Sequence, residues 1–504
     1  MSTAEGTALG IVLIVAGALR FTALGAGIPA AVGVDEPFIM DRAFAMMVTG
    51  EFNPGFFEYP SLYMYLQTAV ASVRFVVGSL SGEWYRLDQV TSYDFYLWGR
   101  ALTAALGTLT VLVTWRVGRR LGPVAGLLAA AWLAVEPQHV LQSHFVLTDI
   151  PMTFFVATTL LASIRAREAG VVRAFALAGA LSGLAAATKY TGGVALVIPL
   201  VALGWTPMSA AARLLAAGAI VGSALLAFLL AAPYTVLSLP AFLEGFGYLA
   251  HVHASGEAPG TPAWWTYWLH LQINLGRPLL WLSGAAMVVG VVQAFRGPAG
   301  TRVVWASAVG FIAVFYTELS RETQVYGRYL LPILPALFVL AGGGLALALA
   351  RWGPAVRRVR WRGMLAGVVV AGLLFGPAAI RTGGILVTRA KTSTNELAFA
   401  WILELVPDGA SLVVEAEGMR LPPRYRARNV LRLIERSYED YVQEGVEYLV
   451  ASSLASRGAL AGGPEGDGPA YRRLFQRTQM VYAIQPSAEH PGSEIRVYRI
   501  RDGR

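Results

Sequence analysis

Long apolar runs recur along most of this chain and constrain its fold more than any other feature. The first run lies at residues 8–24, and others follow from residue 100 to residue 380. A helical run of this length can cross the hydrocarbon core of a bilayer. Only 14% of the residues are charged, whereas soluble chains carry about 25%. The sequence therefore predicts a polytopic α-helical membrane protein.

The apolar pattern predicts about eleven transmembrane helices and, in addition, interfacial helices. The predicted spans lie at roughly residues 8–24, 100–115, 122–138, 149–164, 174–189, 192–205, 213–232, 277–295, 303–317, 329–350 and 363–380. The stretch from Tyr59 to Leu80 is also long enough to span, but it carries Arg74 and an aromatic-rich start. We interpret it as a helix at the outer interface, with a twelfth span as the alternative.

Arginine clusters predict the orientation of the chain. Groups such as Arg116, Arg119 and Arg120 occupy short loops that are cytoplasmic under the positive-inside rule. We therefore expect a multi-pass membrane protein with a cytoplasmic N-terminus and an extracytoplasmic C-terminal domain. The first run lacks a basic leader and an A-x-A site, which favours a retained helix over a cleaved signal. Because the net charge of +9 lies in loops, it does not predict a nucleic-acid partner.

Composition divides the chain near residue 385. Residues 1–384 form the predicted membrane module, with a first outer loop at 25–99 and a fourth outer loop at 233–276. Residues 385–504 hold 15 of the 31 acidic residues and predict a small soluble α/β domain. Its pattern is a helix capped near Thr394, a turn at Pro407–Gly409 and a strand, followed by a second helix and strand.

Several kinds of chemistry are missing from the sequence. The chain has no cysteine, which excludes disulfides and thiolate sites. It has no P-loop, HExxH or G-x-S-x-G motif. It also lacks Asp-x-Asp, the usual holder of metal and nucleotide diphosphate in soluble glycosyltransferases. Upstream of residue 385, 14 of 16 acidic residues fall on the predicted outer face. This clustering predicts a polar cavity on that face.

Polar residues at the outer ends of the predicted spans are the candidate functional groups. They are the Asp35–Glu36 pair, Glu58–Tyr59, His144 with Asp149, Lys189 in "TKYTG", and Arg328 in "GRYLLPILP". Only two of the 40 basic residues are lysines. A charged group at membrane depth usually faces a cavity or a partner. Structural roles stay open for each: a helix N-cap for Asp35 or Asp149, snorkelling for Lys189, and a headgroup contact for Arg328.

In order and spacing, these motifs resemble the GT-C glycosyltransferases. The likeness is strongest to the group of protein O-mannosyltransferases and lipid A aminoarabinose transferases, a bacterial glycosyltransferase family 39-like group. The matching elements are the Asp-Glu pair, "YPSLYMYL", a helix that ends in "GRRLG", "QSHFVLTD", "TKYTG", a long fourth outer loop and "GRYLLPILP". Together they cover nearly the whole chain.

The resemblance implies an inverting transfer of a sugar from a polyprenyl-phosphate donor to an acceptor hydroxyl of a protein, lipid or glycan. Asp35 would be the general base and Glu36 would support it. The donor phosphate would contact Arg328, Lys189 and the position of Tyr59, where aminoarabinose transferases carry lysine. The substrates would contact Asp149, His144, Tyr329 and Tyr63. The mannosyltransferases carry arginine where this chain has His144, so recognition by that residue stays open.

The resemblance also implies a divalent metal site (zinc, magnesium or manganese) at Glu58 with His251 or His253. A Glu–His pair is a poor structural zinc site. An incidental or catalytically open metal site stays an alternative, and no cofactor is predicted as required. Two other functions stay open from the sequence. One is a transporter or flippase of a lipid-linked sugar, which should carry charges deep within several spans and show a repeat. The other is a noncatalytic envelope-binding subunit.

Overall fold

The computed structural model describes residues 2–33, 35–255, 260–356, 360–415, 419–454, 456 and 468–500. By internal contacts the chain divides into two compact units. The first unit comprises Met1–Thr22, Ile39–Val90 and Trp98–Ile385. The second comprises Ala23–Phe38, Thr91–Leu97 and Leu386–Arg504. Each unit is described by itself below.

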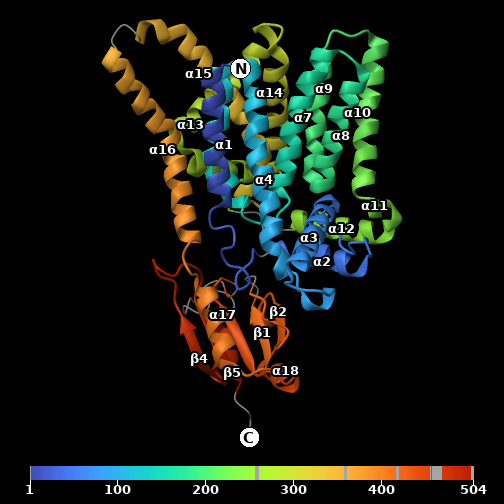
Figure 1. Cartoon of the computed structure of the whole chain (residues 1–504), viewed down its shortest axis with the longest axis vertical. Helices are drawn as coiled ribbons and strands as arrows, with labels where there is room; N and C mark the ends of the chain where they lie inside the picture. The colour runs from blue at the N-terminus through green and yellow to red at the C-terminus, as the bar shows by residue number, and fades with distance from the viewer. Residues whose placement is uncertain are drawn as a thin grey trace. The chain divides into compact units, whose positions relative to one another are not determined.

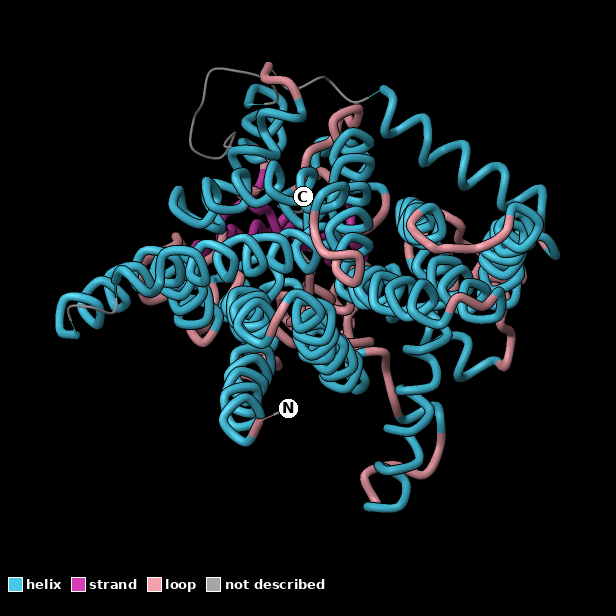
Figure 2. The backbone as a smooth tube through the Cα atoms, turned by 90° about the horizontal axis from the view of Figure 1, so that it is seen from above, coloured by secondary structure: helices cyan, strands magenta, loops and turns pink. Residues whose placement is uncertain are grey.

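The first unit is helical. Its long helices run alongside one another in Figure 1 and are seen end-on in Figure 2. Helices α2 and α4 begin in segments of the second unit. The helices are α1 (Thr3–Phe21), α2 (Glu36–Thr49), α3 (Leu62–Ser81), α4 (Tyr93–Gly118), α5 (Pro123–Val135), α6 (Pro137–Gln142), α7 (Asp149–Ala169), α8 (Val172–Thr188), η3 (Tyr190–Leu196), α9 (Val197–Gly204), α10 (Ala210–Ala231), α11 (Tyr234–Leu237), α12 (Leu239–Ser255), α13 (Ala263–Arg296), α14 (Arg302–Leu319), η4 (Gly327–Ile333), α15 (Leu334–Val356) and α16 (Arg360–Arg389).

The chain is a multi-pass membrane protein. Within the described residues, seven helices are long and apolar enough to cross a membrane, and α5, α8 and Tyr190–Gly204 are shorter apolar helices. Helix α3 is not among the seven, and the total of eleven spans stays a prediction. Helix α13 is kinked at Gly276, whose φ of 74° lies outside helical values, two residues before Pro278. Gly276 suits this position because a side chain would be strained at positive φ.

Small residues bring α8 and α10 into close contact. A Cβ atom built on Gly183 would lie 2.1 Å from the backbone oxygen of Ala224 in α10. Gly179, one turn earlier, would place its Cβ 2.3 Å from the oxygen of Ile220. Such small-residue faces let membrane helices pack backbone to backbone. This packing holds α8, whose end carries Lys189, against its neighbour.

We expect Gly183→Ala to destabilise the protein by about 1–3 kcal/mol, because the added methyl forces α8 and α10 apart. The matched control is Gly218→Ala in α10, where an added Cβ meets no atom within 4 Å. The control should be neutral or slightly stabilising, since alanine favours the helix by about 1 kcal/mol over glycine. Thermal unfolding in detergent measures both variants. Equal melting temperatures for the two would contradict the packing account.

The second unit contains a mixed five-stranded sheet with helices on both faces, so the predicted α/β domain is confirmed as a fold. The strand order is β2-β1-β3-β5-β4, in which β1 pairs in parallel with β2 and β3, and β5 pairs antiparallel with β3 and β4. The elements are α17 (Thr394–Leu405), β1 (Ser411–Glu415), β2 (Arg426–Val430), α18 (Tyr438–Gln443), β3 (Tyr448–Ser452), α19 (Gly468–Gln476), β4 (Thr478–Ile484) and β5 (Ile495–Ile500).

Alternation along the strands builds two cores in this domain. Leu412 and Val414 of β1 belong to the core that includes Ile402 of α17, whereas Val413 belongs to the core with Tyr441 and Leu474. Successive strand residues face opposite sides of a sheet, which explains the division. Ser393 caps α17 in a capping box with Glu396, one residue before the predicted cap.

A buried carboxylate ties the end of β1 to its neighbours. Glu415 accepts hydrogen bonds from the backbone N–H of Leu433 at 2.9 Å and of Ser452 at 2.8 Å, and from the hydroxyl of Tyr471. Burial, together with this carboxylate, raises the pKa of Tyr471. Its hydroxyl therefore stays protonated and donates, which is the state that the buried acceptor requires.

Candidate active site

Three charged side chains and one aromatic ring, drawn from three segments, meet at one end of the first unit. Lys189 Nζ donates to Asp149 Oδ1 at 2.7 Å, and Arg328 Nε lies 3.9 Å from Asp149 Oδ2. The Lys189 ammonium also lies 4.3 Å from the centre of the Tyr329 ring. These four residues are called the Asp149 cluster below. The cluster therefore brings two cations onto one carboxylate.

Breaks between helices place the charged members of the cluster. Asp149 is the first residue of α7, and Lys189 is the extended residue between the end of α8 and the start of η3. Arg328 lies in η4, directly before α15. The side chains of Asp149, Lys189 and Arg328 are only 4%, 15% and 22% exposed. Because burying unpaired charges costs several kcal/mol, such a set persists only where the charges satisfy one another or a ligand.

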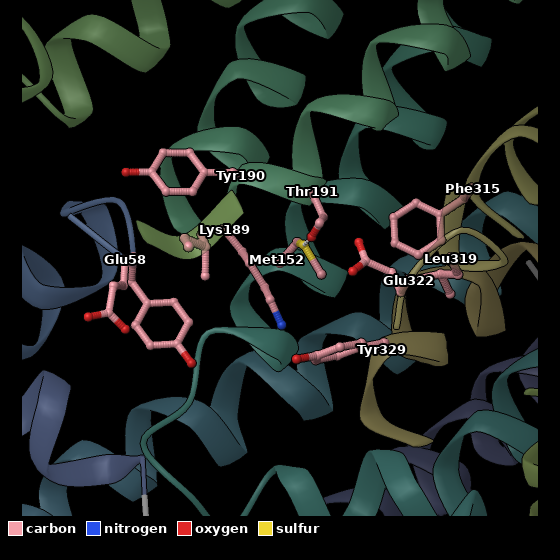
Figure 3. A pocket seen from close by; sticks show the side chains of 11 residues that line it. Glu58, Met152, Lys189, Tyr190, Thr191, Phe315, Leu319, Glu322 and Tyr329 are labelled. Carbon is pink, nitrogen blue, oxygen red and sulfur yellow. Dashed lines mark hydrogen bonds between the residues drawn. The ribbon is translucent and has the colours of Figure 1, made fainter. Parts of the chain in front are cut away.

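The cluster borders a pocket with an empty volume of about 570 Å³. Figure 3 shows Lys189 and Tyr329 between Glu58 on one side and Glu322 on the other. The walls come from six segments of the chain. One is the loop that precedes α3, and the other five are α7, η3, α12, α14 and η4, with the residues next to them. The residues that line the pocket are Glu58, Tyr59, Met152, Lys189, Tyr190, Thr191, Leu249, Phe315, Leu319, Glu322 and Tyr329. The pocket thus combines charged groups with an apolar wall, which is typical of small-molecule sites.

Tyr190 fixes the wall that carries Glu58. Its hydroxyl donates to the backbone oxygen of Phe57 at 2.8 Å. Its ring packs against Phe242 and Phe246 of α12 at centroid distances of 6.3 and 5.2 Å. The residue next to Lys189 therefore holds the loop before α3 and the helix α12 at the pocket.

A second buried network supports the segment that leads to Asp149. Arg20 of α1 donates to the backbone oxygens of Leu133 at 2.9 Å and Ala134 at 3.0 Å, and one of its nitrogens lies 2.9 Å from Nδ1 of His139. These bonds satisfy the last carbonyls of α5, which have no partner within the helix. Glu136 accepts from the backbone N–H of His139 at 2.5 Å and caps α6.

Three of the four predicted substrate residues do not line the pocket: Asp149, which contacts the lining residue Lys189, and His144 and Tyr63. Arg328, predicted to contact the phosphate, is not a lining residue either. His144 is fully buried, with its ring nitrogens 2.8 Å from the backbone oxygen of Val140 and 2.9 Å from that of Thr22. Tyr63 is also fully buried, and its hydroxyl lies 2.5 Å from Oγ1 of Thr103 in α4. In this structure His144 therefore joins the end of α1 to the segment before α7, and Tyr63 joins α3 to α4.

The Asp35–Glu36 pair belongs to the second unit. Asp35 directly precedes α2 and is half-buried. Glu36 is fully buried, and its Oε2 accepts from the backbone N–H of Gly33 at 2.6 Å. Glu36 thus reaches back to satisfy a donor before its own helix, as the glutamate of a capping box does. This geometry assigns Glu36 a structural contact and leaves the catalytic role of Asp35 as a prediction.

Residues 97–237 match the dolichyl-phosphate-mannose-protein mannosyltransferase family. No protein of curated function matches the chain in sequence at a significant level. The oligosaccharyltransferase of Archaeoglobus fulgidus in the apo form is 14% identical with a TM-score of 0.58, covering 97% of this chain and 74% of its own. ArnT of Cupriavidus metallidurans, bound to undecaprenyl phosphate, is 16% identical with a TM-score of 0.55, covering 99% of this chain and 98% of its own.

This chain has the GT-C glycosyltransferase fold. The likeness to ArnT runs over nearly the full length of both chains, including the C-terminal domain. The fold class inferred from the sequence is therefore confirmed.

A metal site in this protein lacks support from the described residues. No group of three or more His, Cys, Asp and Glu side chains that could hold a metal occurs among them. Glu58 lines the pocket, and His251 is exposed on α12. The side chain of His253 lies outside the described residues. A catalytic zinc site uses three protein ligands, and the described residues offer no such set.

Sequence reasoning missed several residues of the pocket. Glu322, Met152, Thr191 and Tyr190 line the pocket but were not predicted. Tyr190 and Thr191 follow Lys189 directly in "TKYTG". Glycine often marks the end of a helix, so the glycines after Thr191 indicated an irregular segment that could have been assigned to the site. Glu322 stands six residues before Arg328, in an irregular segment with no motif of its own.

Proposed function

We propose that this protein is an inverting glycosyltransferase that takes a sugar from a polyprenyl-phosphate donor and transfers it to an acceptor hydroxyl. The observation that carries the proposal is the Asp149 cluster, two cations held on one carboxylate beside a pocket. Two related structures support the donor class. ArnT is bound to undecaprenyl phosphate, and an archaeal oligosaccharyltransferase, AglB from Archaeoglobus fulgidus, is in complex with dolichol-phosphate.

The two cations of the cluster suit the leaving group. In the donor the phosphate is a diester with one negative charge. When the bond between the sugar C1 and the phosphate oxygen breaks, the electron pair goes to that oxygen and the phosphate gains charge. Lys189 and Arg328 would then bind the product phosphate more tightly than the donor. Interactions that strengthen as charge develops accelerate the reaction. Interactions that bind the donor and the transition state equally do not raise kcat.

Asp149 and Tyr329 would position the cations for this role. Asp149 holds Lys189 by a charge-assisted hydrogen bond, and the Tyr329 ring lies against the ammonium. Both contacts restrict a flexible four-carbon side chain before the donor arrives. The carboxylates of Glu58 and Glu322, at opposite sides of the pocket, are candidates to accept hydrogen bonds from hydroxyls of the sugar.

Asp35 would act on the acceptor. The acceptor oxygen forms a bond to C1 from the face opposite the leaving phosphate, and its proton passes to the Asp35 carboxylate. The result is a glycoside of inverted configuration, polyprenyl phosphate and a protonated Asp35 that returns its proton to water. A single displacement needs no covalent sugar–enzyme intermediate. We further propose that the reaction occurs at the outer face of the bacterial cytoplasmic membrane, with a protein, lipid or glycan acceptor.

A deletion strain tests the acceptor class of the proposed reaction. Mass spectrometry would compare envelope peptides and lipids between wild type, the deletion strain and strains complemented with wild type or Asp35→Asn. Loss of a hexose or pentose from one acceptor class, restored only by the wild-type gene, is the expected result. Full restoration by Asp35→Asn would contradict the assigned base, and unchanged glycosylation in the deletion strain would contradict a transferase acting on these classes.

A further inference from the structure

A basic pocket lies at the end of α7 that is remote from the Asp149 cluster. It is lined by Trp115, Arg116, Arg119, Arg120, Leu161 and Arg165. Arg165 follows Asp149 by 16 positions in the same helix, which corresponds to about 24 Å at 1.5 Å per residue. Four arginines and a tryptophan therefore gather at the opposite membrane end from the candidate active site.

Two of the four arginines are already paired, and two are not. Arg119 Nε lies 2.6 Å from Glu5 Oε1 of α1, and Arg120 forms an ion pair with Glu168. Arg116 and Arg165 are exposed and form no ion pair or hydrogen bond with any residue that the structure describes. The pocket thus carries two guanidinium groups whose charge is uncompensated. A planar guanidinium with five N–H donors is well suited to phosphate oxygens.

Trp115 supplies an independent observation. Its side chain is 7% exposed and lines the pocket, yet its indole N–H has no hydrogen-bond partner within the described part of the chain. The Arg119 guanidinium lies 5.6 Å from the centre of the Trp115 ring. A buried donor normally has a partner, so a missing one indicates an acceptor from a ligand. An anion with several oxygens would satisfy both unpaired arginines beside this buried indole.

An exposed leucine on α4 and a buried leucine on α7 lie on the side of the pocket that faces along the helices. Leu109 precedes Arg116 by two turns on the same side of α4 and is 44% exposed. Leu161, one turn before Arg165 in α7, lines the pocket. A charged headgroup in the pocket would therefore continue into a surface that can contact acyl chains.

We propose that this pocket binds the phosphodiester headgroup of an anionic phospholipid in the leaflet opposite the active site. Basic pockets between membrane helices recognise such headgroups, and each arginine near the surface contributes about a fivefold gain in affinity. The inference does not rest on the proposed glycosyl transfer, because it uses a different end of the helices. The lipid would hold α1, α4 and α7 together at that end.

Native mass spectrometry of the detergent-purified full chain would test this proposal, with phosphatidylglycerol and phosphatidylcholine as the added lipids. The wild type should bind phosphatidylglycerol in preference, and the double variant Arg116→Gln/Arg165→Gln should bind it about 30-fold more weakly. The matched control is Arg173→Gln, an exposed arginine in the first turn of α8, and it should bind like the wild type. Equal phosphatidylglycerol affinity in the wild type and the double variant would overturn the proposal.

A second variant and a free-phosphate control complete the experiment. Trp115→Phe removes the indole N–H together with part of the bicyclic ring and keeps all four arginines. It should weaken binding of phosphatidylglycerol a few-fold, so it tests the site if the double variant fails to fold. Inorganic phosphate alone should not raise the melting temperature of the wild type. If it stabilises the wild type as much as the lipid does, the pocket binds a free anion and the lipid assignment is wrong.

Discussion

Replacing Asp35 with asparagine is expected to reduce kcat by about 10²–10⁴-fold, the usual contribution of a general base. The variant keeps the size and shape of the side chain but cannot accept the proton of the acceptor hydroxyl. Asp35 is only half-buried and lies just before α2. The melting temperature of the Asp35→Asn variant should therefore stay close to the wild-type value. Mass spectrometry of the polyprenyl phosphate released per enzyme over time measures kcat.

The neighbouring Glu36→Gln variant separates the base from its structural partner. Glu36 is fully buried and bonded to the Gly33 backbone, so its loss should lower the melting temperature more than it lowers kcat. A charged acceptor in such a contact contributes about 1–3 kcal/mol. The opposite pattern, in which Glu36→Gln abolishes turnover at normal stability and Asp35→Asn stays active, would assign the base to Glu36.

Replacing Lys189 with alanine is expected to lower kcat/KM by about 10²–10³-fold, the typical cost of removing one charge-stabilising group. The substitution removes a cation beside the developing phosphate charge and leaves the buried Asp149 carboxylate with Arg328 as its remaining cation at 3.9 Å. The loss should appear in kcat as well as in KM, because the contact strengthens in the transition state.

The chain provides a matched control for this variant. Lys391 is the other lysine of the sequence, and it donates to the backbone oxygen of Ala488 at an exposed position. Lys391→Ala should retain near wild-type kcat/KM. If Lys189→Ala and Lys391→Ala show the same kinetics, Lys189 does not act on the donor phosphate.

Much of the fold follows from patterns that the sequence displays directly. Apolar runs and their flanking arginines predicted the helical membrane module, and the helix–turn–strand pattern after Thr394 predicted the α/β domain. Strand β2 was missed because its sequence, Arg426–Val430, is polar and mostly exposed at the edge of the sheet. An edge strand with charged side chains does not show the alternation on which strand prediction depends.

The site was predictable residue by residue but not as an assembly. Lys189 and Arg328 were identified as unusual charges, yet nothing in the sequence indicated that Asp149, 40 positions before Lys189, would hold both. Arg20 was missed for a related reason. Its partners are backbone carbonyls at the end of α5, more than 100 positions away, and backbone acceptors leave no trace in residue type. By contrast, the motif Glu58–Tyr59 before Pro60 predicted Glu58 as a site residue, and Glu58 lines the pocket.

Proteoliposomes containing a polyprenyl-phosphate sugar, the purified protein and an envelope extract as acceptor provide the most direct test of the central claim. The account predicts that sugar leaves the lipid and appears on an acceptor, with one polyprenyl phosphate formed for each sugar transferred, and that Asp35→Asn prevents both. Movement of the intact lipid-linked sugar across the bilayer without formation of polyprenyl phosphate would contradict the account and identify a flippase instead.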